Sequence, residues 1–225
     1  MSDLESYFLH NPGRLIHKWM HYFEVYERHL SRYRGTDVHL VEIGVAHGGS
    51  LEMWRNYFGP RAKLWGIDVD PTIQPFDDDG IRLLIGDQSD RGFLRQVRQT
   101  IPRIDVVIDD GGHTMAQQRT TLEELLPAIA ADGAYICEDL HTSYWPAYGG
   151  GHLDPHSYIE FSKNLIDRLN AWYSQEPSLA VNEFTRSVHS MHYYNSMLVI
   201  EKRPQSTPEH RQIGRPTLPG PTPLP

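Results

Sequence analysis

Short apolar runs, bounded by glycine, proline and polar turns, recur along the first two thirds of the chain. Runs of this length that are rich in valine and isoleucine are typical of strands buried on both faces of a parallel sheet. Stretches with helical spacing lie between them, and strands that alternate with helices predict an α/β fold. The predicted strands cover residues 38–44, 63–69, 81–85, 104–108 and 133–137, and the predicted helices cover 51–58, 91–100 and 115–130.

The two ends of the chain complete this pattern. Apolar and aromatic residues at helical spacing over 15–33 predict an amphipathic helix, with Asn11 as its cap and Pro12 in its first turn. This helix would pack on the domain or on a second copy of the chain, so it is compatible with a homo-oligomer. A further helix and two closing strands are predicted over 157–173, 182–190 and 195–202.

Together these elements predict a mostly parallel seven-stranded sheet that ends in an antiparallel strand pair. We expect three regions: a helical segment over 1–35, the α/β domain over 36–203 and a tail over 204–225. The tail is rich in proline and has no apolar periodicity, which predicts disorder.

Composition narrows the function classes. The 225 residues carry a net charge of -8, which argues against a nucleic-acid partner. No run approaches the roughly 20 apolar residues that span a bilayer, so we expect no membrane partner. The N-terminus lacks the pattern of a signal peptide, and the single cysteine, Cys137, excludes a disulfide framework within the chain. These features predict a cytoplasmic protein.

A glycine-rich turn joins the first strand to the next helix, with the spacing Glu42-x-Gly44-x-x-x-Gly-Gly. Such a turn aims backbone N–H groups at a cofactor, but the spacing differs from the dinucleotide pattern Gly-x-Gly-x-x-Gly. The carboxylate of Glu42 suits a cationic ligand, such as the ammonium and sulfonium groups of S-adenosylmethionine. Asp68, at the end of the second strand, suits the hydroxyls of a ribose. Asp87 and Gln88 follow the third strand, where they would bind an adenine edge or cap the next helix.

Two acidic pairs carry the strongest chemical signal. The fourth strand ends in Asp109-Asp110-Gly-Gly-His113, and the fifth ends in Glu138-Asp139. Neighbouring strand ends lie side by side in a doubly wound sheet, so Asp110, Glu138 and Asp139 should converge, while Asp109 points to the opposite side. Clustered carboxylates need a cation, and an all-oxygen set suits Mg²⁺, with Mn²⁺ and Ca²⁺ as alternatives.

A glycine-rich and aromatic loop over 142–156 follows the second acidic pair. Loops of this length often form lids or binding walls. Tyr144 and Trp145, with His141 just before them, are therefore candidate contacts for an acceptor substrate. Packing of these side chains on the domain surface is the alternative.

Five motifs give the chain a family resemblance: Glu42-Ile-Gly-Val-Ala-x-Gly-Gly-Ser-Leu-x-Met-Trp, Gly66-Ile-Asp, Gly86-Asp-Gln, Ile108-Asp-Asp-Gly-Gly-His and Glu138-Asp-Leu-x-Thr-Ser-Tyr-Trp. Over about residues 14–203 the chain resembles class I S-adenosylmethionine-dependent methyltransferases with a Rossmann-like fold. More narrowly, it is similar to the metal-dependent sugar O-methyltransferases of macrolide tailoring, the macrocin and mycinamicin group.

The resemblance implies roles for individual residues. Asp110, Glu138 and Asp139 would bind Mg²⁺, and His113 would be the catalytic base. Lys18 and Tyr22 match an N-terminal segment that lies near the cofactor in that family, although His17 stands where an acid is commoner. The residues implied to serve S-adenosylmethionine are Glu42, Gly44, Ser50, Asp68, Asp87, Gln88 and Asp109, together with Lys18 and Tyr22.

The expected activity is Mg²⁺-assisted methyl transfer from S-adenosylmethionine to a sugar or deoxysugar hydroxyl. The acceptor would be a glycosylated natural product or a nucleotide sugar. Three alternatives stay open at this point. They are an O-methyltransferase for catechol-type phenols, a non-catalytic module that binds the cofactor, and a metal-dependent hydrolase.

Overall fold

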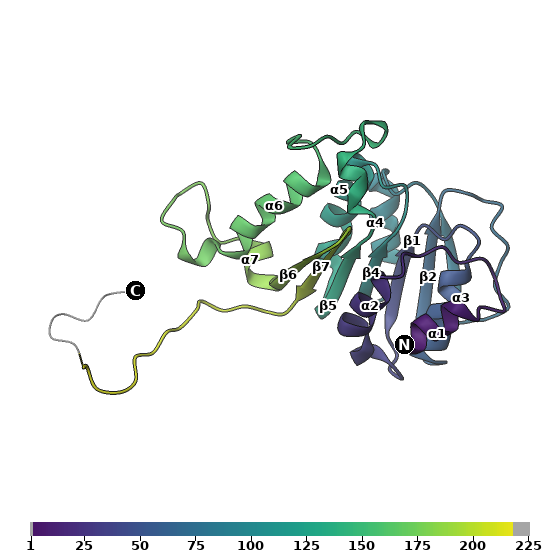
Figure 1. The fold of residues 1–225 in the computed structure, drawn as a ribbon, viewed down its shortest axis with the longest axis horizontal. Coiled ribbons are helices and arrows are strands. Elements are labelled where there is room, and N and C mark those ends of the chain that lie inside the picture. Colours follow the sequence, from purple (N-terminus) through teal and green to yellow (C-terminus); the bar gives the residue numbers. More distant parts are fainter. Residues whose placement is uncertain (1, 218–225) are drawn as a thin grey trace.

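A seven-stranded sheet forms the centre of the protein, which is described over residues 2–217 by a computed structural model. The strand order is β3-β2-β1-β4-β5-β7-β6 (Figure 1). Strands β1 to β5 run parallel, and β7 pairs antiparallel with both β5 and β6. The predicted sheet and its closing antiparallel pair are confirmed. The strands are β1 (His39–Ile43), β2 (Lys63–Asp68), β3 (Ile81–Ile85), β4 (Ile104–Asp109), β5 (Ile129–Cys137), β6 (Val188–Tyr194) and β7 (Met197–Lys202).

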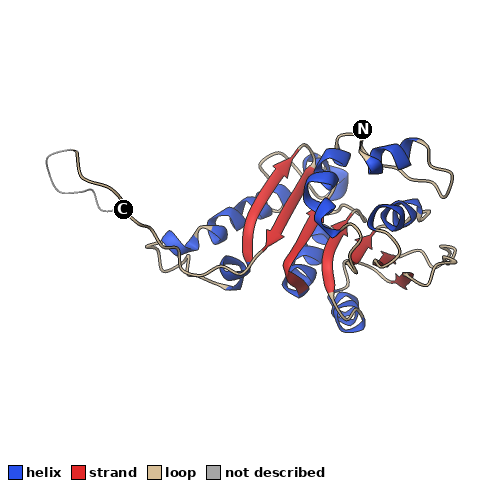
Figure 2. Ribbon diagram, turned by 90° about the horizontal axis from the view of Figure 1, so that it is seen from below, coloured by secondary structure: helices blue, strands red, loops and turns tan. Residues whose placement is uncertain are grey.

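Helices cover both faces of this sheet (Figure 2). Each face buries a hydrophobic cluster against these helices. One face carries α1 (Asp3–Leu9), α2 (Tyr22–Leu30) and α3 (Gly49–Phe58). The other carries α4 (Arg91–Thr100), α5 (Met115–Leu125), α6 (Tyr158–Leu169) and α7 (Glu183–Ser187). Short 3₁₀ helices lie at Ser31–Tyr33, Leu126–Ala128, Leu140–Tyr144, Pro146–Tyr148 and Ala171–Tyr173.

The order of the strands fixes where a ligand can bind. The chain goes outward from β1 to β2 and β3 on one side, and then returns to place β4 against the other side of β1. In open α/β sheets, ligands bind beyond the carboxyl ends of the strands at such a reversal. The glycine turn after β1 and the acidic pair after β4 therefore meet at one point of the sheet edge.

The helix expected over 15–33 is wrong in its first half, because α2 begins only at Tyr22. Residues 11–21, here called the N-terminal strap, have no helix and lie across the glycine turn. Arg14 and Lys18 bind residues distant in sequence, and these contacts hold the strap in an irregular path. The aromatic face of α2 packs into the chain's own core, so it is not left for a second copy.

The fifth strand and its preceding helix also differ from their predicted lengths. The helix expected over 115–130 ends at Leu125, since Pro127 has no N–H with which to continue it. The strand expected to begin at residue 133 begins at Ile129. It pairs there with Ile104, before an irregularity in the register.

Three differences concern the C-terminal elements. The helix expected over 157–173 ends at Leu169, and the strand expected over 182–190 begins with α7. The reason for α7 is a capping box, in which Asn182 and Thr185 satisfy each other's backbone N–H groups. The hairpin between β6 and β7 turns at residues 195–196, not at the predicted 191–194.

After β7 the chain leaves the domain as an extended segment (Figure 1). Residues 203–217 contain no helix or strand. The predicted disorder of the tail also covers 218–225, which lie outside the described residues. Across the part of the chain that the structure describes, no helix has the length and apolar character needed to cross a membrane.

Candidate active site

A pocket of about 430 Å³ opens at the carboxyl ends of the central strands. Its volume is within the range of small-molecule sites. The glycine turn, the acidic pairs and the N-terminal strap all contribute to its walls. The predicted site residues that line it are Lys18, Tyr22, Gly44, Ser50, Asp68, Asp87, Gln88, Asp110, His113, Glu138 and Asp139.

Two glycines allow backbone segments to touch at this pocket. Gly44 has φ +88°, and a Cβ there would lie 2.0 Å from the carbonyl oxygen of Asp110. A Cβ on Gly49 would lie 2.2 Å from the carbonyl oxygen of Arg14, in the N-terminal strap. The glycine turn thus brings two strand ends together and lets the strap pass directly over α3.

Asp68 and Asp87 stand at the ends of β2 and β3. Asp68 Oδ2 accepts hydrogen bonds from the N–H groups of Val45 and Ala46, at 2.8 and 2.9 Å. Asp68 therefore fixes the glycine turn while it also lines the pocket. Asp87 lines the pocket and accepts a hydrogen bond from Ser89 N–H at 2.7 Å.

Asp109 and Asp110 point in opposite directions, as their alternation along a strand predicts. Asp109 is 1% exposed and accepts hydrogen bonds from Gln88 Nε2 and the Tyr135 hydroxyl, each at 2.9 Å. Burial raises the pKa of Asp109 to about 7. Gln88 Oε1 in turn accepts from Gly112 N–H at 2.7 Å. Asp109 lies behind Gln88 and is not among the residues that line the pocket over 2–217.

Glu42 is fully buried behind the glycine turn. It accepts hydrogen bonds from the Ser50 hydroxyl at 2.8 Å and from Trp54 Nε1 at 3.2 Å. Burial raises the pKa of Glu42. Lys18 Nζ, 3.7 Å from Glu42 Oε1, is the cation that faces it in the described structure.

Lys18 reaches from the N-terminal strap into the acidic cluster. Its Nζ donates to Asp110 Oδ2 at 2.6 Å and to Glu138 Oε2 at 3.0 Å, and its side chain is 2% exposed. Burial lowers the pKa of Lys18, but the charges of Asp110 and Glu138 outweigh burial and hold that pKa well above its ordinary value. The amine is therefore a permanent positive charge between two of the predicted metal ligands.

Two tyrosines of α2 bind the second acidic pair. The Tyr26 hydroxyl donates to Glu138 Oε1 at 2.6 Å, and the Tyr22 hydroxyl donates to Asp139 Oδ1 at 2.8 Å. Burial, together with the charge of Asp110, raises the pKa of Glu138 to about 8. Tyr26 was missed as a site residue by the sequence analysis. Its position four residues after Tyr22 places both hydroxyls on the same helix face.

His113 lies between the two partly buried carboxylates of the pocket, Asp110 and Asp139. Its Nε2 is 3.8 Å from Asp110 Oδ1 and 3.6 Å from Asp139 Oδ2. Its Nδ1 is buried and has no hydrogen-bond partner among the described residues. Burial lowers the pKa of His113 despite these carboxylates, so the neutral imidazole is favoured.

The donor set of this pocket fits a divalent cation. Ligand atoms of Asp110, His113 and Asp139 all lie within 4.8 Å of one another. Carboxylate oxygens with room for water are the ligands that Mg²⁺ prefers, and an imidazole alongside also suits a transition metal. Glu138 lines the same pocket but is bound by Lys18 and Tyr26. The predicted convergence of acids is therefore present, with a lysine between two of them.

The predicted acceptor contacts lie beside the pocket, not in its wall. Tyr144 and Trp145 are 51% and 47% exposed, and within residues 2–217 neither they nor His141 line the pocket. The ring of His141 packs edge-on against Trp145 and against Trp19, which does line the pocket. Trp19 was not predicted as a site residue, because its position fits the apolar spacing of the helix expected over 15–33 and no other sequence signal distinguishes it. The loop also has more local order than expected, with two 3₁₀ turns.

Comparison with known proteins gives a consistent result. No protein-family model matches the chain. It is 37% identical over 196 residues to an 8-demethyl-8-(2-methoxy-alpha-L-rhamnosyl)-tetracenomycin-C 3'-O-methyltransferase of Streptomyces olivaceus, covering 82% of this chain and 50% of that protein. It is 34% identical over 216 residues to the mycinamicin VI 2''-O-methyltransferase of Micromonospora griseorubida, covering 90% of this chain and 52% of the relative.

A solved structure agrees with these sequence matches. The MycE methyltransferase of the mycinamycin biosynthetic pathway, in complex with Mg and SAH, superposes with a TM-score of 0.77 at 31% identity. The alignment covers 90% of this chain and 54% of that structure. The chain thus spans about half the length of the relatives it matches. Over that shared half it has the Rossmann-like methyltransferase fold, and it belongs to this family of natural-product sugar O-methyltransferases.

Proposed function

We propose that this chain is the methyltransferase part of an S-adenosylmethionine-dependent, Mg²⁺-dependent sugar O-methyltransferase. The single observation that carries the proposal is that Asp110, His113 and Asp139 gather in one pocket. This occurs in a chain 37% identical to a rhamnosyl O-methyltransferase. The acceptor would be a sugar hydroxyl of a glycosylated natural product or of a nucleotide sugar.

Asp110, Glu138 and Asp139 would hold the Mg²⁺. A divalent cation there would supply positive charge that favours ionisation of a sugar hydroxyl, which is a weak nucleophile at neutral pH. Tyr22 and Tyr26 orient the carboxylates of Asp139 and Glu138 by hydrogen bonds. Lys18 supplies part of the neutralising charge and ties the N-terminal strap to the same carboxylates.

His113 would act as the general base at Nε2. That atom faces Asp110 and Asp139, so an acceptor hydroxyl placed beside these acids could pass its proton to the ring. The hydroxyl oxygen would form its new bond to the methyl carbon while the carbon–sulfur bond of the sulfonium breaks. The sulfur leaves as a neutral thioether, and His113 keeps the proton until it is released to solvent.

S-adenosylmethionine would bind along the glycine turn. Gly44, Ser50, Asp68, Asp87 and Gln88 all line the pocket. Asp68 would bind the ribose, and Asp87 and Gln88 would bind the adenine. Glu42 and Asp109 would act from behind this wall, through Ser50 and Gln88 respectively. The N-terminal strap, including Lys18, would cover the cofactor together with Tyr22 of α2.

The acceptor would enter on the aromatic side of the pocket. Trp19 lines it, and the rings of His141, Trp145 and Tyr148 continue from Trp19 over the neighbouring surface. Exposed Tyr144 lies in the same loop. A small molecule with an apolar portion beside its sugar would contact these rings, which agrees with a small-molecule partner.

The test is transfer of a labelled methyl group from S-adenosylmethionine to three acceptor panels: glycosides, nucleotide sugars and catechols. Each panel is run with Mg²⁺ and with EDTA, and cofactor binding is measured by calorimetry with NAD as a control. We expect cofactor binding without NAD binding, and methyl transfer to a sugar that stops in EDTA. Full turnover in EDTA would show that methyl transfer needs no divalent cation. Transfer to catechols alone would show that the acceptor is a phenol and not a sugar.

A further inference from the structure

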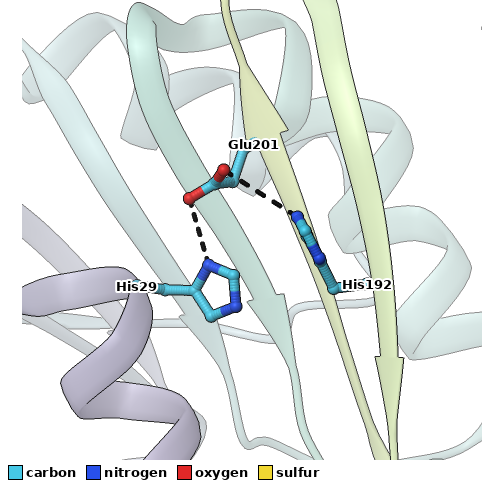
Figure 3. A group of neighbouring side chains, drawn as sticks. All are labelled: His29, His192 and Glu201. Atoms are coloured by element: carbon cyan, nitrogen blue, oxygen red, sulfur yellow. Dashed lines mark hydrogen bonds and ion pairs between the residues drawn. The ribbon is translucent and has the colours of Figure 1, made fainter.

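A second group of side chains with the chemistry of metal ligands lies away from the pocket, at the C-terminal end of α2. His29 is on α2, His192 is on β6 and Glu201 is on β7. We call these three residues the His–Glu cluster. Figure 3 shows both imidazole rings directed at the two oxygens of the one carboxylate. No residue of the cluster takes part in the proposed methyl transfer.

The spacing of the cluster matches a tetrahedral metal site. With bonds of about 2.0–2.2 Å, two ligands of a tetrahedral zinc ion stand about 3.4 Å apart. His29 Nδ1 lies 3.0 Å from Glu201 Oε1, and His192 Nε2 lies 3.8 Å from Glu201 Oε2. Three such ligand atoms, one from each residue, fall within 4.8 Å of one another. The two distances run to different oxygens of the Glu201 carboxylate, and they lie on either side of the tetrahedral value.

The surroundings of the cluster also suit a metal ligand set. His29 Nε2 lies 2.8 Å from the Tyr194 hydroxyl, the kind of outer partner that fixes the orientation of a metal-bound histidine. Ser190 Oγ lies 2.9 Å from His192 Nε2 and 3.5 Å from Glu201 Oε2, so a bound ion would take the place of this hydroxyl at His192 Nε2. The side chain of His29 is 3% exposed and that of His192 is 37% exposed. One histidine of the cluster is therefore buried, and water can reach the other.

We propose that the His–Glu cluster binds a Zn²⁺ ion, with two imidazoles and one carboxylate as protein ligands and water in the fourth position. Two nitrogen ligands and one oxygen ligand favour Zn²⁺ over Mg²⁺, which prefers oxygen alone. His29 ligates through Nδ1, and its other ring nitrogen carries the proton and donates to Tyr194. The ion joins the C-terminal end of α2 to the β6–β7 hairpin.

This position gives the ion a structural role. Tyr22 and His29 lie seven residues apart on α2, which corresponds to about 10 Å along the helix. One end of α2 therefore contacts the carboxylates of the pocket through Tyr22 and Tyr26, while the other end is held by the His–Glu cluster. A metal at the His–Glu cluster would hold α2 in place, and α2 carries the tyrosines that contact the pocket carboxylates.

Arg32 forms an ion pair with Glu201, one of the proposed Zn²⁺ ligands. Its guanidinium lies 3.3 Å from Glu201 Oε1 and is 45% exposed. This cation competes with a metal for the same carboxylate. Removal of Arg32 should therefore tighten Zn²⁺ binding, an outcome that loss of a merely structural contact would not produce.

The experiment measures Zn²⁺ binding by competition with a chromophoric chelator, with saturating Mg²⁺ present throughout. An Asp139→Asn background removes one of the three side chains, Asp110, His113 and Asp139, that could bind Zn²⁺ in the pocket. Zn²⁺ bound in the pocket is thereby distinguished from Zn²⁺ bound at the His–Glu cluster. Loss of an outer partner alone costs about 10–100-fold in affinity, so His192→Ala, which removes a ligand, should weaken binding at least about 10-fold. Arg32→Gln should tighten it by about two- to fivefold. His189→Ala, an exposed histidine on the same strand, is the matched control and should leave binding unchanged.

A second readout does not depend on the chelator. Co²⁺ added to the Asp139→Asn protein should give visible absorption bands of a four-coordinate site, and His192→Ala should abolish them. Binding that survives His192→Ala, or that disappears with Asp139→Asn, would overturn the proposal. Because neither readout uses methyl transfer, this result is independent of the proposed function.

Discussion

Two groups of histidine and carboxylate side chains, both able to hold a metal, are built in different ways. The pocket group, Asp110, His113 and Asp139, lies where parallel strands end and their turns meet. The His–Glu cluster joins a helix end to an antiparallel hairpin. The pocket group has a buried lysine beside it, whereas the His–Glu cluster has a half-exposed arginine.

The difference shows how each part of the fold restricts its polar residues. Strand ends in a parallel sheet leave buried backbone and side chains close together, so each carboxylate in the pocket must have a specific partner. Residues on an edge hairpin alternate between a packed and a solvated side. Water screens the charge of a cation on the solvated side, so its ion pairs contribute little to stability. We expect changes in the pocket to have large effects and equivalent changes near the cluster to have small ones.

The largest expected effect is on catalysis. His113→Ala should lower kcat by about 10²–10⁴-fold, because this is the rate enhancement that a general base typically contributes. Calorimetry should show S-adenosylmethionine binding retained. His192→Ala in the other group should leave kcat within about twofold when Zn²⁺ is absent from the assay. Equal losses of kcat in the two variants would show that the pocket histidine is no more important for catalysis than the histidine of the His–Glu cluster.

The next effect is on stability and compares the two cations. Lys18→Met should lower the free energy of unfolding by about 3–5 kcal/mol, because it leaves the buried Glu138 and the partly buried Asp110 without their partner. Arg32→Gln removes an exposed partner of Glu201 and should cost less than about 1 kcal/mol. Urea unfolding in EDTA measures both. Mg²⁺ should restore part of the stability of Lys18→Met, since it returns positive charge to the same acids.

The fold was largely predictable because its core strands are short and apolar. The five parallel strands follow from their composition, and the family motifs place them in one sheet. The path of residues 11–21 did not follow, since their helical spacing is overridden by contacts of Arg14 and Lys18 with distant residues. Helix α7 was missed because a capping box between Asn182 and Thr185 is stronger than the strand propensity around it.

The site was predictable where acids directly follow buried strands. Asp110, Glu138 and Asp139 stand at neighbouring strand ends, so topology alone brings them to one pocket. The position of Lys18 between them depends on an irregular segment, and no local pattern specifies it. The His–Glu cluster was not predicted at all, because its three residues are separated by up to 172 positions and follow ordinary polar alternation.

A third prediction concerns the contact of the two central strand ends. Gly44→Ala should lower the free energy of unfolding by about 1–3 kcal/mol or more, because its Cβ would meet the Asp110 carbonyl oxygen and φ is positive. Gly35→Ala also has a positive φ, but its Cβ would meet nothing within 4 Å. The difference between the two variants isolates the steric contact from backbone strain. Equal costs would show that Gly44 is needed only for its conformation.

The smallest effect is a pH dependence at the His–Glu cluster. Burial lowers the pKa of His29 below its ordinary value of 6.5, although hydrogen bonding and charge from Glu201 act in the opposite direction. His192 and Arg28 also lower it, and Arg32 and Tyr194 lie nearby. Glu201 has a lowered pKa and stays ionised above its ordinary value of 4.5. The proton uptake of folded His29 is therefore displaced to lower pH.

The sign follows from proton uptake. The unfolded chain binds a proton at a higher pH than folded His29 does, so the free energy of unfolding should fall as pH decreases through 6.5. Urea unfolding in EDTA, from about pH 7.5 to about pH 5.5, should show this loss in the native chain and a shallower slope in His29→Asn. An identical slope in both proteins would mean that solvation of His29, not its burial, controls its charge. The contrast between the cluster and the pocket would then not extend to the burial of His29.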